Sequence, residues 1–265
     1  MVRAVPTWLR IAAWCFVLLT GLLLLAPLVV VVGVSVSESQ FIVFPPQGFS
    51  LRWYEKALST PAFLDAFWLS LGLATLVTAT ATVIGGAAAI GLSRGRQGSQ
   101  LETFFLSPLV LPSIIFAIGL LMLWSTLFGT TSFYVLWLAH TVIALPYVIR
   151  TTLAVLAERD PYVNEAARTM GAGRLQRLLL VTLPQCIPGL AAGAFFAFNI
   201  SFDEAVLSLF LRNPNLTTLP VQIYGQLEFS PDPTVAAVST VMIMITLVLM
   251  VLLERLMGLN RFASG

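Results

Sequence analysis

Charged residues are scarce in this chain. Aspartate, glutamate, lysine and arginine make up 10% of its 265 residues, against 58% hydrophobic residues. Soluble domains carry roughly 25% charged residues, so the composition indicates a membrane protein, in agreement with a mean hydropathy of +0.93. The net charge is only +2, which gives no basic surface of the kind that a nucleic-acid-binding protein uses.

Lysine, histidine and cysteine are also rare. A phosphate-binding Walker A loop needs Gly-Lys followed by Ser or Thr, whereas the single lysine, Lys56, lies in YEKAL without a glycine-rich loop. The two cysteines, Cys15 and Cys186, lie in apolar stretches and form no CxxC pair, which argues against a structural disulfide or a zinc site. We therefore expect no cofactor, no metal and no catalytic residues in this chain, since no nucleophile–base pair is visible either.

Long hydrophobic runs dominate what is present. Six segments reach the ~20 apolar residues that a spanning helix needs, namely residues 8–34, 66–92, 104–128, 132–156, 185–208 and 234–256. The first run is longer than the roughly 7–15 residues of a signal-peptide core, so we interpret it as a retained helix. The sequence predicts an all-α membrane protein, a single domain over residues 1–265 with six transmembrane helices.

The arginines predict the orientation of these helices. With the N-terminus placed in the cytoplasm, eleven arginines fall on the cytoplasmic side, and only Arg52, Lys56 and Arg212 fall outside. This distribution follows the positive-inside rule. Both termini and the polar segment 158–184, between the fourth and fifth spans, are therefore predicted to be cytoplasmic.

The cytoplasmic segment contains NEAARTMGAGRLQRLLLVTLP, residues 164–184, with three arginines, two glycines and a proline. Asp160 suits the N-cap of a short helix and Pro161 its first turn. Gly171 can end that helix in a left-handed conformation. A second helix is expected to follow, up to Pro184 at the start of the fifth span. A loop that only sets the orientation would explain the arginines but not the ordered spacing of the other residues.

One stripe of the first short helix is small and apolar. Tyr162, Ala166 and Met170 follow one another at intervals of four residues, and Ala167 lies beside them. Such a surface on a cytoplasmic helix favours close packing in a groove of another protein.

The spacing Glu-Ala-Ala, three residues, Gly, nine residues, Val, one residue, Leu-Pro resembles the EAA loop of the permease subunits of bacterial ABC importers. The matching residues are Glu165, Ala166, Ala167, Gly171, Leu183 and Pro184, with Val181 where isoleucine is usual. The stretches SLRWYEKAL, LPSIIFAIGLL and SFDEAVLSLF are similar, in the same order, to the spermidine/putrescine-type branch. Within that branch the chain is most similar to the second of two permease subunits.

The resemblance implies a type I ABC importer permease fold in the bacterial inner membrane. It implies two copies of an ATPase subunit that bind the ATP, a second permease in a heterodimer, and a periplasmic or lipid-anchored substrate-binding protein. The matching residues, together with Met170, would form a coupling loop over 158–184 that transmits ATPase closure to the membrane helices. The chain itself would be a non-catalytic transport subunit.

Candidate substrate-path residues lie near the outer end of the fifth span. Asp203 is 19 residues beyond Pro184, about 28 Å of helix. An aspartate at that depth is only weakly penalised by the membrane, so a solvated helix end explains it as well as a ligand site does. However, Asn199 shares its face, and Asp203 with Glu204 falls on the branch's Ser-x-Asp-Asp/Glu pattern. A carboxylate in this place would attract a cationic amine.

Ser113 departs from the polyamine pattern, because relatives often carry an acidic residue at that position. This leaves an amino-acid-like compound or an aminophosphonate as alternative solutes. Trp53 and Tyr54 are interpreted as part of an interfacial aromatic belt, with a role in an outer gate as the alternative. His140 is interpreted as a hydrogen-bonded packing residue.

Two other function classes stay open from the residues alone. A proton- or sodium-coupled transporter would normally show ionisable groups or broken helices near the membrane midplane. A receptor or scaffold would use the segment 158–184 only to bind a cytoplasmic protein.

Overall fold

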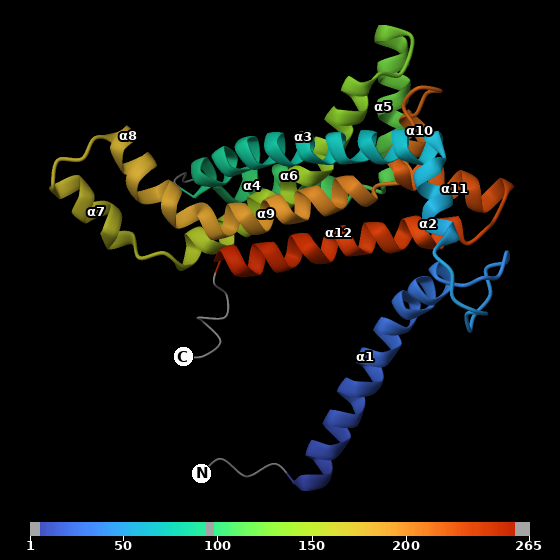
Figure 1. The fold of residues 1–265 in the computed structure, drawn as a ribbon. Coiled ribbons are helices and arrows are strands. Elements are labelled where there is room, and N and C mark those ends of the chain that lie inside the picture. The colour runs from blue at the N-terminus through green and yellow to red at the C-terminus, as the bar shows by residue number, and fades with distance from the viewer. Residues whose placement is uncertain (1–5, 94–97, 258–265) are drawn as a thin grey trace. The chain divides into compact units, whose positions relative to one another are not determined.

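The computed structural model describes residues 6–93 and 98–257, which are almost entirely helical (Figure 1). Within these residues, five helices are long and apolar enough to cross a membrane, or six when one bent pair counts as a span. The chain divides into two compact units, Met1–Leu64 with Ile223–Ile245, and Asp65–Gln222 with Thr246–Gly265.

The smaller unit begins with α1 (Thr7–Ser35), whose apolar side chains are exposed around its whole circumference. A helix of this kind requires lipid or another protein around it. The short helix α2 (Arg52–Ser59) is fastened to the end of α1 and the chain that follows it. The buried Trp53 indole donates to the Ser37 carbonyl over 2.8 Å, and the Tyr54 hydroxyl lies 2.7 Å from that of Ser35.

An ion pair also links α2 to the turn between α11 (Leu219–Phe229) and α12 (Thr234–Met257). Lys56 Nζ lies 2.7 Å from Asp232 Oδ2, and Asp232 Oδ1 accepts the Thr234 N–H over 2.8 Å. Burial alone would raise the pKa of Asp232, but hydrogen bonds from Lys56 and Thr234 and the charge of Lys56 hold that pKa below its ordinary value. Asp232 therefore both pairs with α2 and caps α12.

The third predicted span, 104–128, is not one continuous helix. α4 (Gly98–Leu106) and a 3-10 turn (Ser107–Leu109) precede α5 (Ser113–Phe128), and the two halves are bent by 98°. Pro108 and Pro112 explain the break, because proline has no amide hydrogen to donate and disfavours helical geometry in the residue before it.

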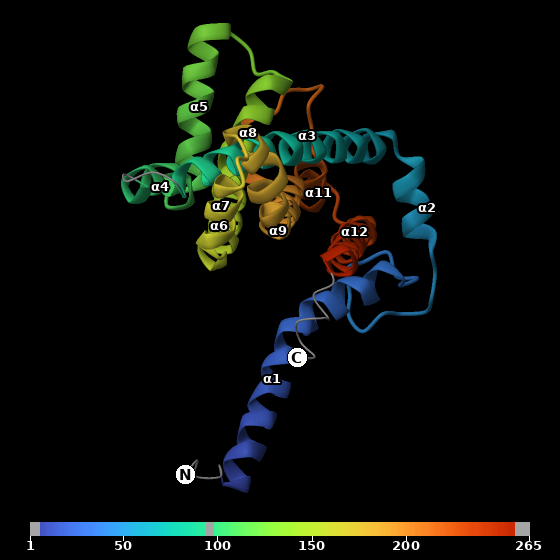
Figure 2. The ribbon, with the colours of Figure 1, turned by 90° about the vertical axis from the view of Figure 1, so that its left-hand side faces the viewer.

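The larger unit is organised around α6 (Phe133–Glu158) and α9 (Leu183–Asp203), which pack against each other (Figures 1 and 2). Glycines in α9 bring the two backbones together. A Cβ added at Gly189 would lie 2.7 Å from the Thr151 carbonyl oxygen, and one at Gly193 would lie 2.8 Å from Val148 Cα. Close approach at small residues is a common way for membrane helices to associate.

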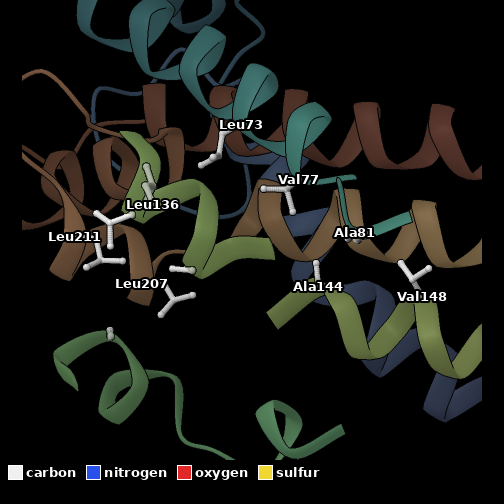
Figure 3. Packing of buried hydrophobic residues seen from close by; sticks show 12 residues of the cluster. Leu73, Val77, Ala81, Leu136, Ala144, Val148, Leu207 and Leu211 are labelled. Carbon is white, nitrogen blue, oxygen red and sulfur yellow. The ribbon is translucent and has the colours of Figure 1, made fainter. Parts of the chain in front are cut away.

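The helix α3 (Pro61–Leu92) contributes one stripe, Leu73, Val77 and Ala81, to a buried apolar cluster (Figure 3). Its other labelled members come from α6 and from α10 (Val206–Leu211): Leu136, Ala144, Val148, Leu207 and Leu211. The spacing of four residues puts the α3 side chains on one face of the helix, and this face forms the apolar core of the unit.

The helix α3 also carries several threonines and a pair of adjacent glycines. The hydroxyls of Thr75, Thr78 and Thr80 donate to carbonyls four residues earlier, over 2.6–2.7 Å. This pattern satisfies the hydroxyls within the helix. A Cβ at Gly85 would lie 3.0 Å from Val148 Cβ, and one at Gly86 would lie 2.6 Å from Leu190 Cδ2.

Candidate functional site

The polar segment between α6 and α9 begins with the short helix α7 (Pro161–Thr169). Asp160 caps it, because its carboxylate accepts the Tyr162 N–H over 2.9 Å, and Pro161 occupies the first turn. Both features confirm the start expected from the sequence. Proline is well suited to this position because the first amide hydrogens of a helix have no partner within it.

Gly171 ends α7 with a positive φ of 84°, as its place in the sequence predicts. The Gly171 N–H donates to the Arg168 carbonyl and the Ala172 N–H to the Ala167 carbonyl, each over 3.0 Å. These two bonds form a Schellman motif. An L-residue with a side chain is strained at such a φ, so glycine lets the chain turn back directly after α7.

Side chains of the motif face in different directions. Tyr162 and Met170 are 72% and 81% exposed, and Ala166 between them is exposed as well. The predicted stripe is therefore accessible. Ala167, which the sequence places beside this stripe, is buried instead. It lies about 140° around the helix from Tyr162, at 100° per residue. Ala167 therefore belongs to the buried side of α7 and not to the exposed stripe.

The chain after Gly173 is continuous with the fifth span. The helix α8 (Arg174–Arg177) passes through a π-helical stretch (Leu178–Thr182) into α9 without a break, and Leu183 and Pro184 are exposed. The expected separate helix ending at Pro184 is therefore absent. The wider hydrogen-bond spacing of a π turn leaves room for a proline that cannot donate to the preceding turn.

α7 and α8 project from one end of the α6–α9 pair, and α10 lies at the other end (Figures 1 and 2). At this other end α9 stops at Asp203, whereas the sequence predicts a span to residue 208. Glu204 ends the helix with an extended ψ of 105°. Its carboxylate accepts the N–H groups of Val206 and Leu207 over 2.9 and 3.0 Å, so this acid caps α10.

The other substrate-path candidates differ in exposure and in hydrogen bonding. Asp203 is exposed at the last position of α9. Asn199 is partly buried, and its amide donates to the Phe195 carbonyl over 2.8 Å within the same helix. Ser113 is exposed at the start of α5. Of these side chains, the Asp203 carboxylate provides an exposed negative charge.

His140 is a fully buried polar residue of α6. Its Nδ1 lies 3.0 Å from the Ser201 hydroxyl of α9, and its Nε2 lies 3.1 Å from the Ser208 hydroxyl of α10. Both ring nitrogens are therefore satisfied, which confirms a packing role. The histidine therefore joins α6, α9 and α10. Its partner in α9, Ser201, is two residues before Asp203.

Two features of this region are not predicted by the sequence. Membrane orientation is sufficient to explain the arginines of 158–184 in the sequence, whereas in the structure Arg159, Arg168, Arg174 and Arg177 line one pocket. The serines that face His140 are not predicted either. The residues i and i+7 on either side of the α9 end, Ser201 and Ser208, were the available signal.

The fold is that of the membrane subunits of type I ABC importers. Two solved structures are similar to it along most of their length. A bacterial transporter that imports the acidic polysaccharide alginate has a TM-score of 0.72 at 15% identity, over 96% of this chain and 99% of that one. The MetNI methionine ABC transporter has a TM-score of 0.62 at 20% identity, over 73% and 93%.

Residues 81–261 match the family described as binding-protein-dependent transport system inner membrane component. The chain belongs to this family and is the permease subunit of an ABC importer, a multi-pass protein of the inner membrane. This membership decides against the ion-coupled carrier and the receptor that the residues alone left open.

Similar proteins include two polyamine permeases and one aminophosphonate permease. The spermidine/putrescine permease PotC of Escherichia coli K12 is 31% identical over 227 residues, covering 85% of this chain and 86% of PotC. The putrescine permease PotI of the same strain is 32% identical, covering 86% and 84%. The putative 2-aminoethylphosphonate permease PhnV of Salmonella typhimurium LT2 is 29% identical, covering 87% and 88%.

Proposed function

We propose that α7 couples this permease to two separate ATPase subunits, with its exposed stripe seated in a groove of one of them. The observation that carries the proposal is the pairing of an EAA-like sequence with a short helix that is capped at both ends and accessible along Tyr162, Ala166 and Met170. ATP would be bound by the partner subunits, and this chain would have no catalytic role.

The connection from α7 to the membrane helices suits the transmission of movement. The helix from Arg174 to Asp203 is continuous, so a displacement at its first turn is carried along its length. The Asn164 amide lies 3.5 Å from the Thr182 hydroxyl and joins α7 to this helix. Because α6 and α9 pack backbone to backbone, they would move as one body when ATPase closure displaces α7. Such rocking opens a path alternately to each side.

The solute is proposed to be a small cationic amine of the polyamine type. The support is the identity with PotC and PotI and the exposed carboxylate of Asp203 at the end of α9 away from α7. A negative charge at the mouth of a path raises the local concentration of cations. Glu204 and Asn199 would shape this end of the path, because hydrogen bonds within the chain fix the positions of their side chains.

A second candidate solute is an aminophosphonate. The similarity to PhnV supports it, and so does Ser113, since one carboxylate fewer suits a solute with a single amine. Asp203 would still receive the ammonium group of such a compound.

The proposed assembly has the orientation that the arginines predict, with both termini and α7 in the cytoplasm. A second, different permease would pair with this one, and a periplasmic or lipid-anchored binding protein would deliver the solute. The family description, which names binding-protein-dependent transport, supports the latter partner. Trp53 and Tyr54 would hold α2 in place as part of an outer gate, through their bonds to Ser37 and Ser35.

The solute is tested by uptake of labelled putrescine and spermidine into cells that lack this gene. Complementation with the native chain is expected to restore uptake, and Asp203→Asn is expected to reduce it at equal expression. Asp65→Asn, at an exposed acid near the start of α3, is the matched control and should transport normally. Failure of the native chain to restore polyamine uptake, with restored uptake of 2-aminoethylphosphonate, would favour the second candidate.

Coupling is tested separately with Glu165→Lys and Gly171→Asp. Both variants are expected to insert normally, while ATP hydrolysis by the assembled transporter no longer drives uptake. Glu254→Lys, at an acid near the end of α12, controls for the change of charge. Normal uptake by both coupling variants contradicts the role of α7.

A further inference from the structure

A pocket of about 440 Å³ lies beside α7, lined by six polar side chains. These are Arg159, Asn164, Glu165, Arg168, Arg174 and Arg177. Four guanidinium groups and one carboxylate leave three net positive charges in a small volume. Among the residues that the structure describes, the ion pair is Lys56–Asp232. None of the four arginines of the pocket therefore lies within ion-pair distance of a carboxylate in this part of the chain.

Two of the arginines have buried donors without partners. Arg159 Nη1 and Arg177 Nε are shielded from solvent and make no hydrogen bond within the described part of the chain. A buried unpaired donor on a charged group is unfavourable. An anion with several oxygens would satisfy both donors and balance the excess charge, because guanidinium groups bind phosphate through paired, charge-assisted hydrogen bonds.

The pocket is on a different side of α7 from the stripe proposed to bind the ATPase. Asn164 and Arg168 lie about 200° and 240° around the helix from Tyr162. An ATPase that covers Tyr162 and Ala166 therefore leaves these pocket residues uncovered.

The two arginines with unpaired donors lie near the ends of candidate spanning helices, where lipid headgroups are expected. Arg159 directly follows the spanning helix α6, and Arg177 is near the start of the span that continues into α9. Leu179 and Leu180, just beyond Arg177, are 48% and 74% exposed. Exposed leucines beside a cluster of arginines suit acyl chains and a headgroup at the same time.

We propose that this pocket binds the phosphate group of an anionic phospholipid from the cytoplasmic leaflet, held by Arg159 and Arg177 with Arg168 and Arg174 at its rim. The lipid fills the space between α7 and the start of α8 and fixes their relative position.

The test is native mass spectrometry of the purified, delipidated full chain, titrated with phosphatidylglycerol or phosphatidylethanolamine. The chain is expected to bind phosphatidylglycerol about tenfold more tightly than phosphatidylethanolamine. The double variant Arg159→Gln/Arg177→Gln should lose this preference, and Arg159→Lys/Arg177→Lys should keep part of it, because lysine retains the charge without the paired geometry. Arg255→Gln, at an exposed arginine of α12, is the control and should bind as the native chain does.

Three outcomes overturn the proposal. Equal binding of the two lipids by the native chain means that no anionic headgroup is selected. Displacement of phosphatidylglycerol by millimolar inorganic phosphate means that a soluble anion is the occupant. Loss of the lipid when the ATPase subunits are added means that their acidic residues fill the pocket. The titration uses the chain without ATPases, so it can fail while the coupling proposed for α7 holds.

Discussion

The α6–α9 contact and the α7–α8 segment are adjacent in the chain and built in opposite ways. In the first, glycines remove side chains so that two backbones meet at Gly189 and Gly193. In the second, side chains are kept and exposed, as at Tyr162 and Met170, and the backbone is held by caps at Asp160 and Gly171.

The difference suits the two mechanical roles that we propose for these regions. Close-packed helices transmit displacement because neither can move without the other. A capped, exposed helix offers a surface to a partner while keeping its own shape. The chain therefore has a close-packed helix pair and, at one end of it, a preformed helix with an exposed surface, joined by the continuous helix Arg174–Asp203.

Enlarging a contact glycine should have the largest effect on the rigid pair. Gly193→Leu forces a side chain against Val148 and Thr151, and we expect it to destabilise the protein by about 3 kcal/mol or more. Thermal unfolding in detergent measures this. Gly72→Leu is the control, because no atom lies within 4 Å of a Cβ built there. Equal stability of the two variants would show that the helices are not tightly packed at Gly193.

Removing the buried histidine should have the next largest effect. His140→Leu leaves the hydroxyls of Ser201 and Ser208 buried without their partner, at a cost of about 2 kcal/mol. The triple variant His140→Leu/Ser201→Ala/Ser208→Ala should recover much of this loss, since it leaves no polar group unpaired. No recovery in thermal unfolding would mean that the histidine acts through its shape and not through these bonds.

A smaller and more local effect is expected at the end of α7. Gly171→Ala places a Cβ on a residue with φ of 84°, which costs roughly 1–2 kcal/mol. Hydrogen exchange of the Gly171 and Ala172 amides should quicken, and uptake should fall, with little change in global stability. Gly173→Ala, at a residue with φ of −65°, should change neither.

The smallest effect is expected from the ion pair of the smaller unit. Lys56 is largely exposed, so Lys56→Ala should cost less than about 1 kcal/mol. The folded pKa of Asp232 is lower than its ordinary value of 3.8, so its contribution is present above pH 3.8 and is lost as pH falls through the lower folded pKa. Asp232→Ala should cost more than Asp232→Asn, because asparagine can still cap α12. Unfolding measured from pH 7 down to pH 3 tests both statements.

The local features of α7 could be read from the sequence because they depend on neighbouring residues. Asp160 and Pro161 start a helix, and Gly171 ends it, through hydrogen bonds that span only a few residues. The family resemblance of this stretch came from the same short spacing. In contrast, the burial of Ala167 and the continuity of the helix past Pro184 depend on packing and hydrogen-bond spacing that no local rule specifies.

Composition and periodicity by themselves determined that this protein is a helical membrane protein with a polar, arginine-rich segment between two spans, because about 20 apolar residues per span have no other stable arrangement in lipid. Only the tertiary structure decided which groups meet. It brought four arginine side chains into one pocket and set His140 of α6 between serines of α9 and α10. Contacts of this kind form when helices separated in sequence pack together, and no spacing along the chain encodes them.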